Sequence, residues 1–375
     1  MAKEQTSEIR GICEAVLGYL MECQDTTPGE FYGSFWSEKA YHAPVLDYHA
    51  GGSHHNRTAG SAGLALWLVG KARGDAEMMR RAEMAFDWLA ARQRPNGGYH
   101  EIQHHEQPSD WEHTGLEECC TIPLGFAIHG LGNALLTGLP PKKLYADCLQ
   151  KAGHWQLGLE WPPGSGIFPH HDRSPYDTLN ANTHAAETLA TVYTAMHQVY
   201  GRRLNIFHRG ARRAVGHTLP LQWPNGCFPY RAGVQVTINY TSLVVWCLLN
   251  CLDVVPEPLR GDLAPTADLK RAFTKAAAFL RSCVGRGGAL KWENETTAGK
   301  NTMWTYVITY SVLRRLGGTA NAQAAARLLR HILARRTDSG MLPMWDVGED
   351  VVHCAYYQAD MLMFLLPYSG LVEAA

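Results

Sequence analysis

The segment RQRPNGGYHE, residues 92–101, is the part of the sequence from which the fold can be deduced. Asn96 and Gly97 supply left-handed turn geometry at the end of a helical pattern, and the large apolar Tyr99 follows two residues after the glycine. The same pairing occurs near the ends of five other helical segments: Gly29/Phe31, Gly166/Phe168, Gly226/Phe228, Gly288/Leu290 and Gly340/Leu342. Successive turn glycines are separated by about 62 residues on average, which is long enough for two helices and two loops.

Two kinds of helix alternate with these turns. The helix before a turn is amphipathic: Met78, Ala82, Ala85 and Leu89 fall on one stripe, while the charged residues of that segment lie mostly off it. After the turn comes a polar loop and then a helix that is apolar on most faces, as in AGLALWLVG (62–70), TSLVVWCLL (241–249) and ADMLMFLL (359–366). A helix with so little polar surface is predicted to be surrounded by other helices.

Six amphipathic outer helices alternating with six apolar inner helices predict an all-α fold, an (α/α)6 toroid formed as one domain over residues 1–375. The chain starts with an outer-type helix, in which Ile9, Ile12, Val16 and Leu20 are in register, and ends with an inner-type helix near 353–366. The last unit can therefore close against the first. An open solenoid of the same hairpins is the alternative, but six units can complete a circle and no polar capping repeat is visible.

Composition excludes several classes of partner. Lys and Arg number 34 and Asp and Glu number 35, for a formal net charge of -1, so the sequence does not predict binding to nucleic acid or to an anionic membrane surface. The N-terminal residues do not resemble a secretory signal, and no apolar stretch reaches 18 residues. The ten cysteines form no C-x-x-C pair, and several lie within apolar helical patterns. Buried free thiols in a reducing cytoplasm are the favoured interpretation.

The polar loops before the inner helices are predicted to open on one end of the barrel, where a site would form. Many of the 18 histidines fall there, together with many aromatic residues. Aromatic faces beside hydrogen-bonding and ionisable groups suit a sugar substrate. The predicted catalytic residues are His55, Asp172, Asn182, His184 and Tyr240. The predicted substrate-binding residues are Asn56, Arg57, Glu101, Glu117, His171, Asn180, Glu187, Trp304, Trp345, His353 and Tyr357.

Three mechanisms match this set of residues. A uronate lyase needs a group that neutralises the carboxylate, and an acid and base for elimination; His55, Asn56, Arg57, Asn182, His184 and Tyr240 are suitable. A glycoside hydrolase needs two carboxylates, for which the candidates are Glu101, Glu117, Asp172, Glu293 and Asp346. A sugar epimerase or isomerase needs acid–base groups beside a carbonyl, and His184 with His353 is a candidate couple.

Metal binding has one formal motif. HEIQH, residues 100–104, has the H-E-x-x-H spacing that places two zinc ligands on one face of a helix. The segment follows the Asn96-Gly97 turn directly, and Pro108 allows only a short helix there. A loop in which His100 and His104 are unrelated is therefore favoured, and the sequence predicts no metal and no cofactor.

The alternating helices and repeated turns resemble a broad group of (α/α) toroid proteins over the whole chain. This group includes six-hairpin glycosidases, toroid polysaccharide lyases, N-acylglucosamine 2-epimerases and terpenoid cyclases. NANTHAAETLA, residues 180–190, is similar to the Asn-x-Asn-x-His-x-x-Glu stretch of some 2-epimerase and aldose–ketose isomerase relatives, matching at Asn180, Asn182, His184 and Glu187. That resemblance implies an acid–base role for His184. HHNRT, residues 54–58, is similar in type, though not in order, to Asn- and His-containing stretches of toroid lyases.

Other members of this group match less of the sequence. Chain length and the expected cytoplasmic setting resemble the unsaturated glucuronyl hydrolases, but their acidic pattern is absent. The Asp-x-Asp-Asp acid motif of protonating terpenoid cyclases is also absent. A terpenoid cyclase or prenyltransferase-like enzyme stays open because an aromatic-lined toroid also suits a carbocation. A toroid that only binds another protein is a further alternative.

The sequence as a whole predicts an enzyme that acts on a small-molecule or oligosaccharide substrate. The leading prediction is cleavage of an acidic, uronate-containing oligosaccharide, with β-elimination slightly favoured over hydrolysis. A sugar 2-epimerase or aldose–ketose isomerase is the first alternative, and a terpenoid-type enzyme is the second.

Overall fold

The computed structural model describes residues 2–36, 54–100, 102–103, 119–171, 174, 176–233, 237–291, 301–346 and 354–373. Within these ranges the chain forms thirteen α-helices. Six make an outer ring: α1 (Ala2–Cys23), α3 (Ala76–Arg92), α5 (Lys143–Gly158), α7 (Asn205–Thr218), α10 (Thr266–Cys283) and α12 (Thr319–Ala334). Six make an inner ring: α2 (Asn56–Arg73), α4 (Thr121–Leu136), α6 (Leu179–Gln198), α8 (Ile238–Val254), α11 (Met303–Leu316) and α13 (Ala355–Leu365).

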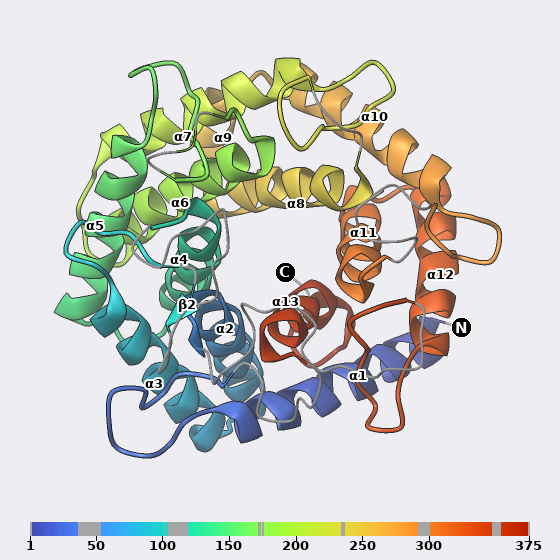
Figure 1. Ribbon diagram of the computed structural model, residues 1–375, viewed down its shortest axis with the longest axis horizontal. Helices are drawn as coiled ribbons and strands as arrows, with labels where there is room; N and C mark the ends of the chain where they lie inside the picture. Colours follow the sequence, from blue (N-terminus) through green and yellow to red (C-terminus); the bar gives the residue numbers. More distant parts are fainter. Residues whose placement is uncertain are drawn as a thin grey trace.

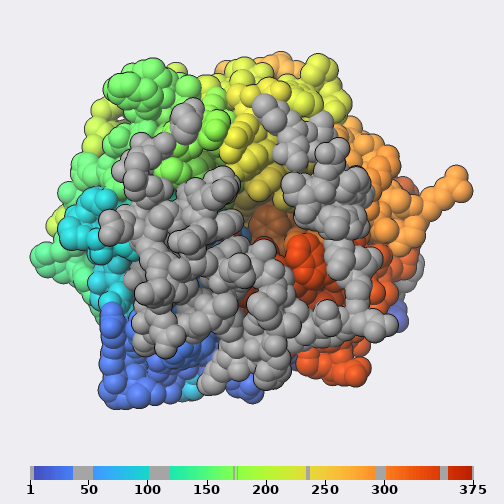
Figure 2. Space-filling model, viewed as in Figure 1, coloured from blue at the N-terminus to red at the C-terminus, as the bar shows by residue number. Residues whose placement is uncertain are grey.

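The inner ring is closed. Each inner helix packs on the next one in sequence order, and the last, α13, packs on the first, α2 (Figure 1). The outer helix α1 also packs on α13, so the first and last α-helices are in contact where the ring closes. In Figure 2 the coloured segments follow one another around the molecule in sequence order, from blue to red. The fold is thus the predicted (α/α)6 toroid, and the open solenoid is excluded.

The two rings differ in burial as the sequence pattern predicts. In the inner helix α4, fourteen of its sixteen residues are buried, including Phe126 and Leu131. In the outer helix α3 only eight of its seventeen residues are buried, and the helix starts at an Asp75 side chain that accepts hydrogen bonds from the backbone N–H groups of Glu77 and Met78. The short helix α9 (Glu257–Leu263) is inserted between α8 and α10.

The repeated turn glycines fix how one unit contacts the next. A Cβ atom at Gly97, where φ is 97°, would lie 2.3 Å from the carbonyl oxygen of Lys151 in the next outer helix, so only glycine fits there. Gly166, Gly226 and Gly288 make the same approach to α7, α10 and α12. Gly340 faces α1, which continues the contact from the last unit to the first.

One turn was assigned to the wrong residue. The sequence pattern predicts Gly29 and Phe31 as the turn glycine and apolar partner of the first unit, but a Cβ at Gly29 would have no neighbour within 4 Å. Gly33, with φ of 94°, is the residue that approaches the outer helix α3, and Phe35 is its fully buried partner. The error arose because PGEF and YGSF both have the glycine-x-apolar pattern, and only the tertiary contact distinguishes them.

A second repeated feature, a side chain that links a turn to the next outer helix, was not predicted. The Nε2 groups of Gln24, Gln93 and Gln222 each donate to the carbonyl oxygen of a turn glycine and to a carbonyl oxygen of the next outer helix, at 2.9–3.1 Å. In the third unit the Glu160 carboxylate takes this place: it accepts a hydrogen bond from Gly166 N and pairs with Arg213 of α7. These side chains satisfy backbone groups that the sharp turn leaves exposed.

The ten cysteines are all buried and free. No helix within the described ranges combines the length and the apolar character that crossing a membrane requires.

Candidate functional site

The loops that precede the inner helices interlock at one end of the barrel. Thr121 N, at the start of α4, donates to the carbonyl oxygen of His170, and Leu179 N, at the start of α6, donates to that of Tyr230. Met303 N, at the start of α11, donates to Met344 O in the same way. The inner helices α4, α6 and α11 are therefore each tied at the first turn to the loop of the following unit. The N-termini of the inner helices lie at one end of the barrel, here called the funnel.

A buried ion pair lies at the base of the funnel, where the ring closes. The Arg57 guanidinium of α2 donates hydrogen bonds to the Tyr356 hydroxyl and to the Asp360 carboxylate, both on α13. The same carboxylate accepts hydrogen bonds from Ser61 Oγ at 3.0 Å and from Trp304 Nε1 at 3.1 Å. Burial raises the pKa of Asp360, and the nearby Arg57 charge opposes that rise.

Aromatic side chains pack around the Arg57–Asp360 pair in the interior of the barrel. The centre of the Arg57 guanidinium lies 3.9 Å from the centroid of the Phe126 ring and 4.3 Å from that of Tyr356. Phe364 makes edge contacts with Trp246 and Trp304, with ring centroids 5.2 and 5.4 Å apart. The funnel therefore has a floor that is aromatic and carries a fixed guanidinium group.

His184 lies in this floor, in the second turn of α6, and is fully buried. Its ring is 4.9 Å from the Phe126 ring, and its Nδ1 atom is 3.7 Å from Cys247 Sγ. Its Nε2 atom has no hydrogen-bond partner among the described residues. Burial lowers the pKa of His184 well below 6.5, and the Arg57 charge adds to that effect. The imidazole is therefore neutral near pH 7 and able to accept a proton.

A polar layer lies next to His184, one turn further along α6. Glu187 Oε1 accepts hydrogen bonds from His129 Nδ1 at 2.6 Å and from Asn250 Nδ2 at 2.9 Å. The donor atoms of His184, Glu187 and Cys247 all lie within 4.8 Å of one another. Imidazole, carboxylate and thiolate are the donor types that zinc accepts, so this trio is where a metal ion could be held. Burial raises the pKa of the Cys247 thiol well above its ordinary value, which keeps the thiol protonated unless a cation is present.

The rim at α6 and α8 combines aromatic rings with a cation. The Tyr230 and Tyr240 rings lie with centroids 4.3 Å apart, and the Arg231 guanidinium is 3.7 Å from the Tyr176 ring. Burial raises the pKa of the Tyr240 hydroxyl, so that it stays protonated and can donate a hydrogen bond. Stacking surfaces beside hydrogen-bond donors form the kind of rim that a sugar ring can contact.

The structure describes four more of the predicted residues, His55, Asn56, Trp345 and Tyr357, in the first unit and in the last. The His55 ring lies 5.1 Å from the Tyr356 ring, and Tyr357 packs edge-on against Tyr356. Asn56 is buried, and its Nδ2 donates to the carbonyl oxygen of His100. Trp345 forms a backbone bridge to the residue just before α11.

Three predicted residues belong to the loop before α6 and the first turn of that helix. The His171 ring stands perpendicular to that of its neighbour His170. Asn180 is buried. Asn182 instead anchors the preceding loop: its amide oxygen accepts from Phe168 N at 2.7 Å, and its Nδ2 donates to α7. Its side chain is engaged toward the outer ring, which the prediction of a catalytic role did not foresee.

Several predictions fall outside the described residues. These are the predicted site residues Glu101, Glu117, Asp172 and His353, the candidate carboxylate Glu293, and His104 of the HEIQH segment. Within that segment, Ile102–Gln103 forms the short strand β2, which pairs antiparallel with β1 (His54–His55). A continuous helix, which the H-E-x-x-H spacing requires for zinc binding, is therefore not formed there.

Asp360 is the main site residue that sequence reasoning missed. It is the single acidic residue in the apolar helix ADMLMFLL, and an isolated charge in a buried helix signals a buried partner. Asp346, predicted as a hydrolytic carboxylate, accepts hydrogen bonds from Tyr306 Oη and from Asn301 N, so it holds the loop before α11.

Solved structures with the same fold were found by comparison. The chain is similar to a cellobiose 2-epimerase from Bacillus thermoamylovorans B4167, with a TM-score of 0.71 and 11% identity over 96% of this chain and 98% of that one. A D-mannose isomerase gives a TM-score of 0.67 and 14% identity, covering 96% and 97% of the two chains. An unsaturated glucuronyl hydrolase specific for heparin gives 0.66 and 11%, covering 98% of each. No family model and no curated protein matches the sequence. All three structures are (α/α)6 toroids, and this chain shares their fold.

Proposed function

We propose that this protein is an enzyme that acts on a carbohydrate, and that His184 transfers a proton at a sugar carbon next to a carbonyl group. The observation that carries the proposal is the state of His184. Its imidazole is buried, neutral near pH 7 and without a described hydrogen-bond partner at Nε2. A general base needs this protonation state.

The neighbouring groups suit such a proton transfer. Removing a proton beside a carbonyl leaves an enediolate, whose negative charge is stabilised by a nearby cation such as Arg57. Returning the proton to the opposite face of the same carbon gives an epimer, and returning it to the adjacent carbon gives an isomer. A second acid–base group is needed on the opposite face, and His353 is the sequence-based candidate for it. Tyr240 and the aromatic rim would hold the sugar ring.

Two further observations favour epimerase or isomerase chemistry over the other mechanisms. The solved structures with this fold include a cellobiose 2-epimerase and a D-mannose isomerase. The NANTHAAE stretch that carries His184 resembles such enzymes.

Cleavage of an acidic oligosaccharide is the second candidate. Elimination from a uronate needs a base and a cation, and His184 and Arg57 supply both types of group. Hydrolysis needs two carboxylates, and it is favoured by the likeness to glycosidases and to the glucuronyl hydrolase.

A cytoplasmic location is part of the proposal, because ten buried cysteines that form no disulfide suit a reducing compartment.

The test uses the purified protein with mannose, glucose, cellobiose and uronate oligosaccharides in deuterated water. Epimerase or isomerase action predicts deuterium at the sugar carbon next to the carbonyl, detected by NMR, with no new reducing ends. Elimination predicts a rise in ultraviolet absorbance together with new reducing ends, and hydrolysis predicts new reducing ends alone.

The variant His184→Gln should lose deuterium incorporation, while His197→Gln, on the exposed end of the same helix, should retain it. Unchanged incorporation in His184→Gln would contradict the proposed role of His184. The absence of turnover on every sugar would instead favour the terpenoid-type or binding-protein alternatives.

A further inference from the structure

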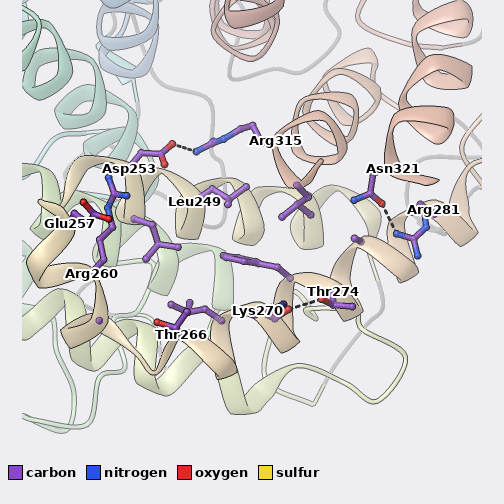
Figure 3. Close-up of a pocket in the computed structure, with 16 residues that line it drawn as sticks. Leu249, Asp253, Glu257, Arg260, Thr266, Lys270, Thr274, Arg281, Arg315 and Asn321 are labelled. Carbon is purple, nitrogen blue, oxygen red and sulfur yellow. Dashed lines mark hydrogen bonds and ion pairs between the residues drawn. The ribbon is translucent and has the colours of Figure 1, made fainter. Parts of the chain in front are cut away.

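A cavity of about 780 Å³ opens at the end of the barrel where α8 and α11 terminate (Figure 3). It is lined by the C-terminal parts of α8 and α11, by α9 and α10, and by Asn321 near the start of α12. The C-termini of α8 and α11 lie far from the helix N-termini that form the funnel, so this cavity is separate from the candidate active site. Its volume is in the range of pockets that hold small-molecule ligands.

Six of the sixteen residues that line this cavity have apolar side chains, and nine have polar or charged ones. Leu249, Leu252, Phe273 and Leu316 pack against the hydrophobic core but are only partly buried, and all four line the cavity. Leu269 and Ala277 complete the apolar part of the lining. Concave apolar surface that stays in contact with water is unfavourable. A ligand with an apolar body would remove that contact.

The charged residues around the apolar lining are mostly cationic. Four are basic (Arg260, Lys270, Arg281 and Arg315) and two are acidic (Asp253 and Glu257). Figure 3 shows Arg260 and Glu257 at one end of the cavity and Arg281 with Asn321 at the other. The formal charge of the lining is therefore +2, in a protein whose net charge is -1.

Only one of the four cations has a carboxylate partner within the described part of the chain. Arg315 pairs with Asp253 at 2.7 Å. Arg281 donates to the neutral Asn321 side chain, and Arg260 Nε donates to the carbonyl oxygen of Val255 at 3.0 Å. Lys270 is exposed. The cavity thus offers positive charge that the protein itself does not neutralise.

We propose that this cavity binds an anionic amphiphile, namely a small molecule with an apolar hydrocarbon body and a single terminal carboxylate. The hydrocarbon would cover the leucines and Phe273, and the carboxylate would pair with the uncompensated cations at the edge. This proposal is independent of the proposed function, because no residue of the funnel takes part in it.

The test is isothermal titration calorimetry of the whole protein with dodecanoate. Two comparison probes separate the contributions: dodecyltrimethylammonium has the same chain with the opposite charge, and acetate has the charge without the chain. We expect saturable binding of one dodecanoate per protein and no comparable binding of either comparison probe.

Two charge-reversal variants on the same helix make a matched pair. Lys270→Glu, in the cavity lining, should weaken dodecanoate binding about tenfold, whereas Lys275→Glu, exposed but outside the lining, should leave it unchanged. Phe273→Ala should weaken binding by a similar factor through lost apolar contact. Circular dichroism of each variant checks that the fold is retained.

Three results would overturn the proposal. The first is the absence of saturable dodecanoate binding, and the second is equal binding of the cationic amphiphile. The third is a stable dimer in sedimentation velocity that excludes dodecanoate, because a second copy of the chain would then cover this surface. Since every readout is binding or mass, failure of the sugar assay does not affect this test.

Discussion

Replacing Asp360 with leucine should destabilise the protein strongly, because the buried Arg57 guanidinium would lose its only carboxylate partner in the described part of the chain. Asp360 is fully buried, and Arg57 is 6% exposed. Breaking a buried ion pair by removing one partner costs about 3–5 kcal/mol. For a chain of 375 residues, that cost lowers the melting temperature by about 4–6 °C, since the entropy of unfolding is about 2 cal/mol/K per residue.

The two single variants should differ in cost. Arg57 keeps its charge at any accessible pH, so Asp360→Leu removes the described carboxylate partner of a cation that stays charged in the core. In Arg57→Met the remaining carboxyl can take up a proton instead, and burial already raises the pKa of Asp360. Arg57→Met should therefore be the milder change. Its stability should decline as pH rises through the raised folded-state pKa of Asp360, because the folded state then loses a proton that it held more tightly than the unfolded state.

The double variant Arg57→Met/Asp360→Leu completes the cycle. It should recover most of the loss, because an apolar pair of similar volume removes both buried charges. The assay is urea unfolding followed by circular dichroism, with melting temperatures from calorimetry. A cost below about 1 kcal/mol for Asp360→Leu, or a double variant as unstable as the sum of the singles, would refute the reasoning.

The other predictions concern His184 of the candidate site and the turn glycine Gly97. His184→Gln should lower turnover by about 10²–10⁴-fold. In the wild-type protein, kcat/KM should decline on the acid side only below pH 6.5, because burial lowers the pKa of His184. A decline that begins above pH 6.5 would contradict this. Wild-type stability should fall more steeply than that of His184→Gln as pH drops below 6.5, since the unfolded chain then binds a proton that folded His184 does not. Gly97→Ala should cost more than about 2 kcal/mol, and the control Gly74→Ala, where a Cβ has open space, only about 1 kcal/mol; equal costs in urea unfolding would remove the packing argument.

The sequence predicted the site less completely than the fold. It singled out Arg57 as a group that could neutralise a carboxylate, and His184 as an acid–base residue of the NANTHAAE stretch. It did not identify Cys247 as the neighbour of His184, because the two lie on different helices and only the packing of α6 on α8 brings them to 3.7 Å. It also assigned Asn182 to catalysis, although the side chain is held by backbone groups of the preceding loop and of α7.

The sequence by itself determined the architecture of this protein, because helix amphipathicity and turn glycines are local signals that recur once per unit. The alternation of half-polar and wholly apolar helices was sufficient to predict two concentric rings and their closure. Tertiary structure alone decided that Gly33 rather than Gly29 is the packing glycine, and that Asp360 is the partner of Arg57, 303 residues away. Such contacts depend on how closely two helices approach and which side chains then meet, and no local pattern along the chain encodes that distance.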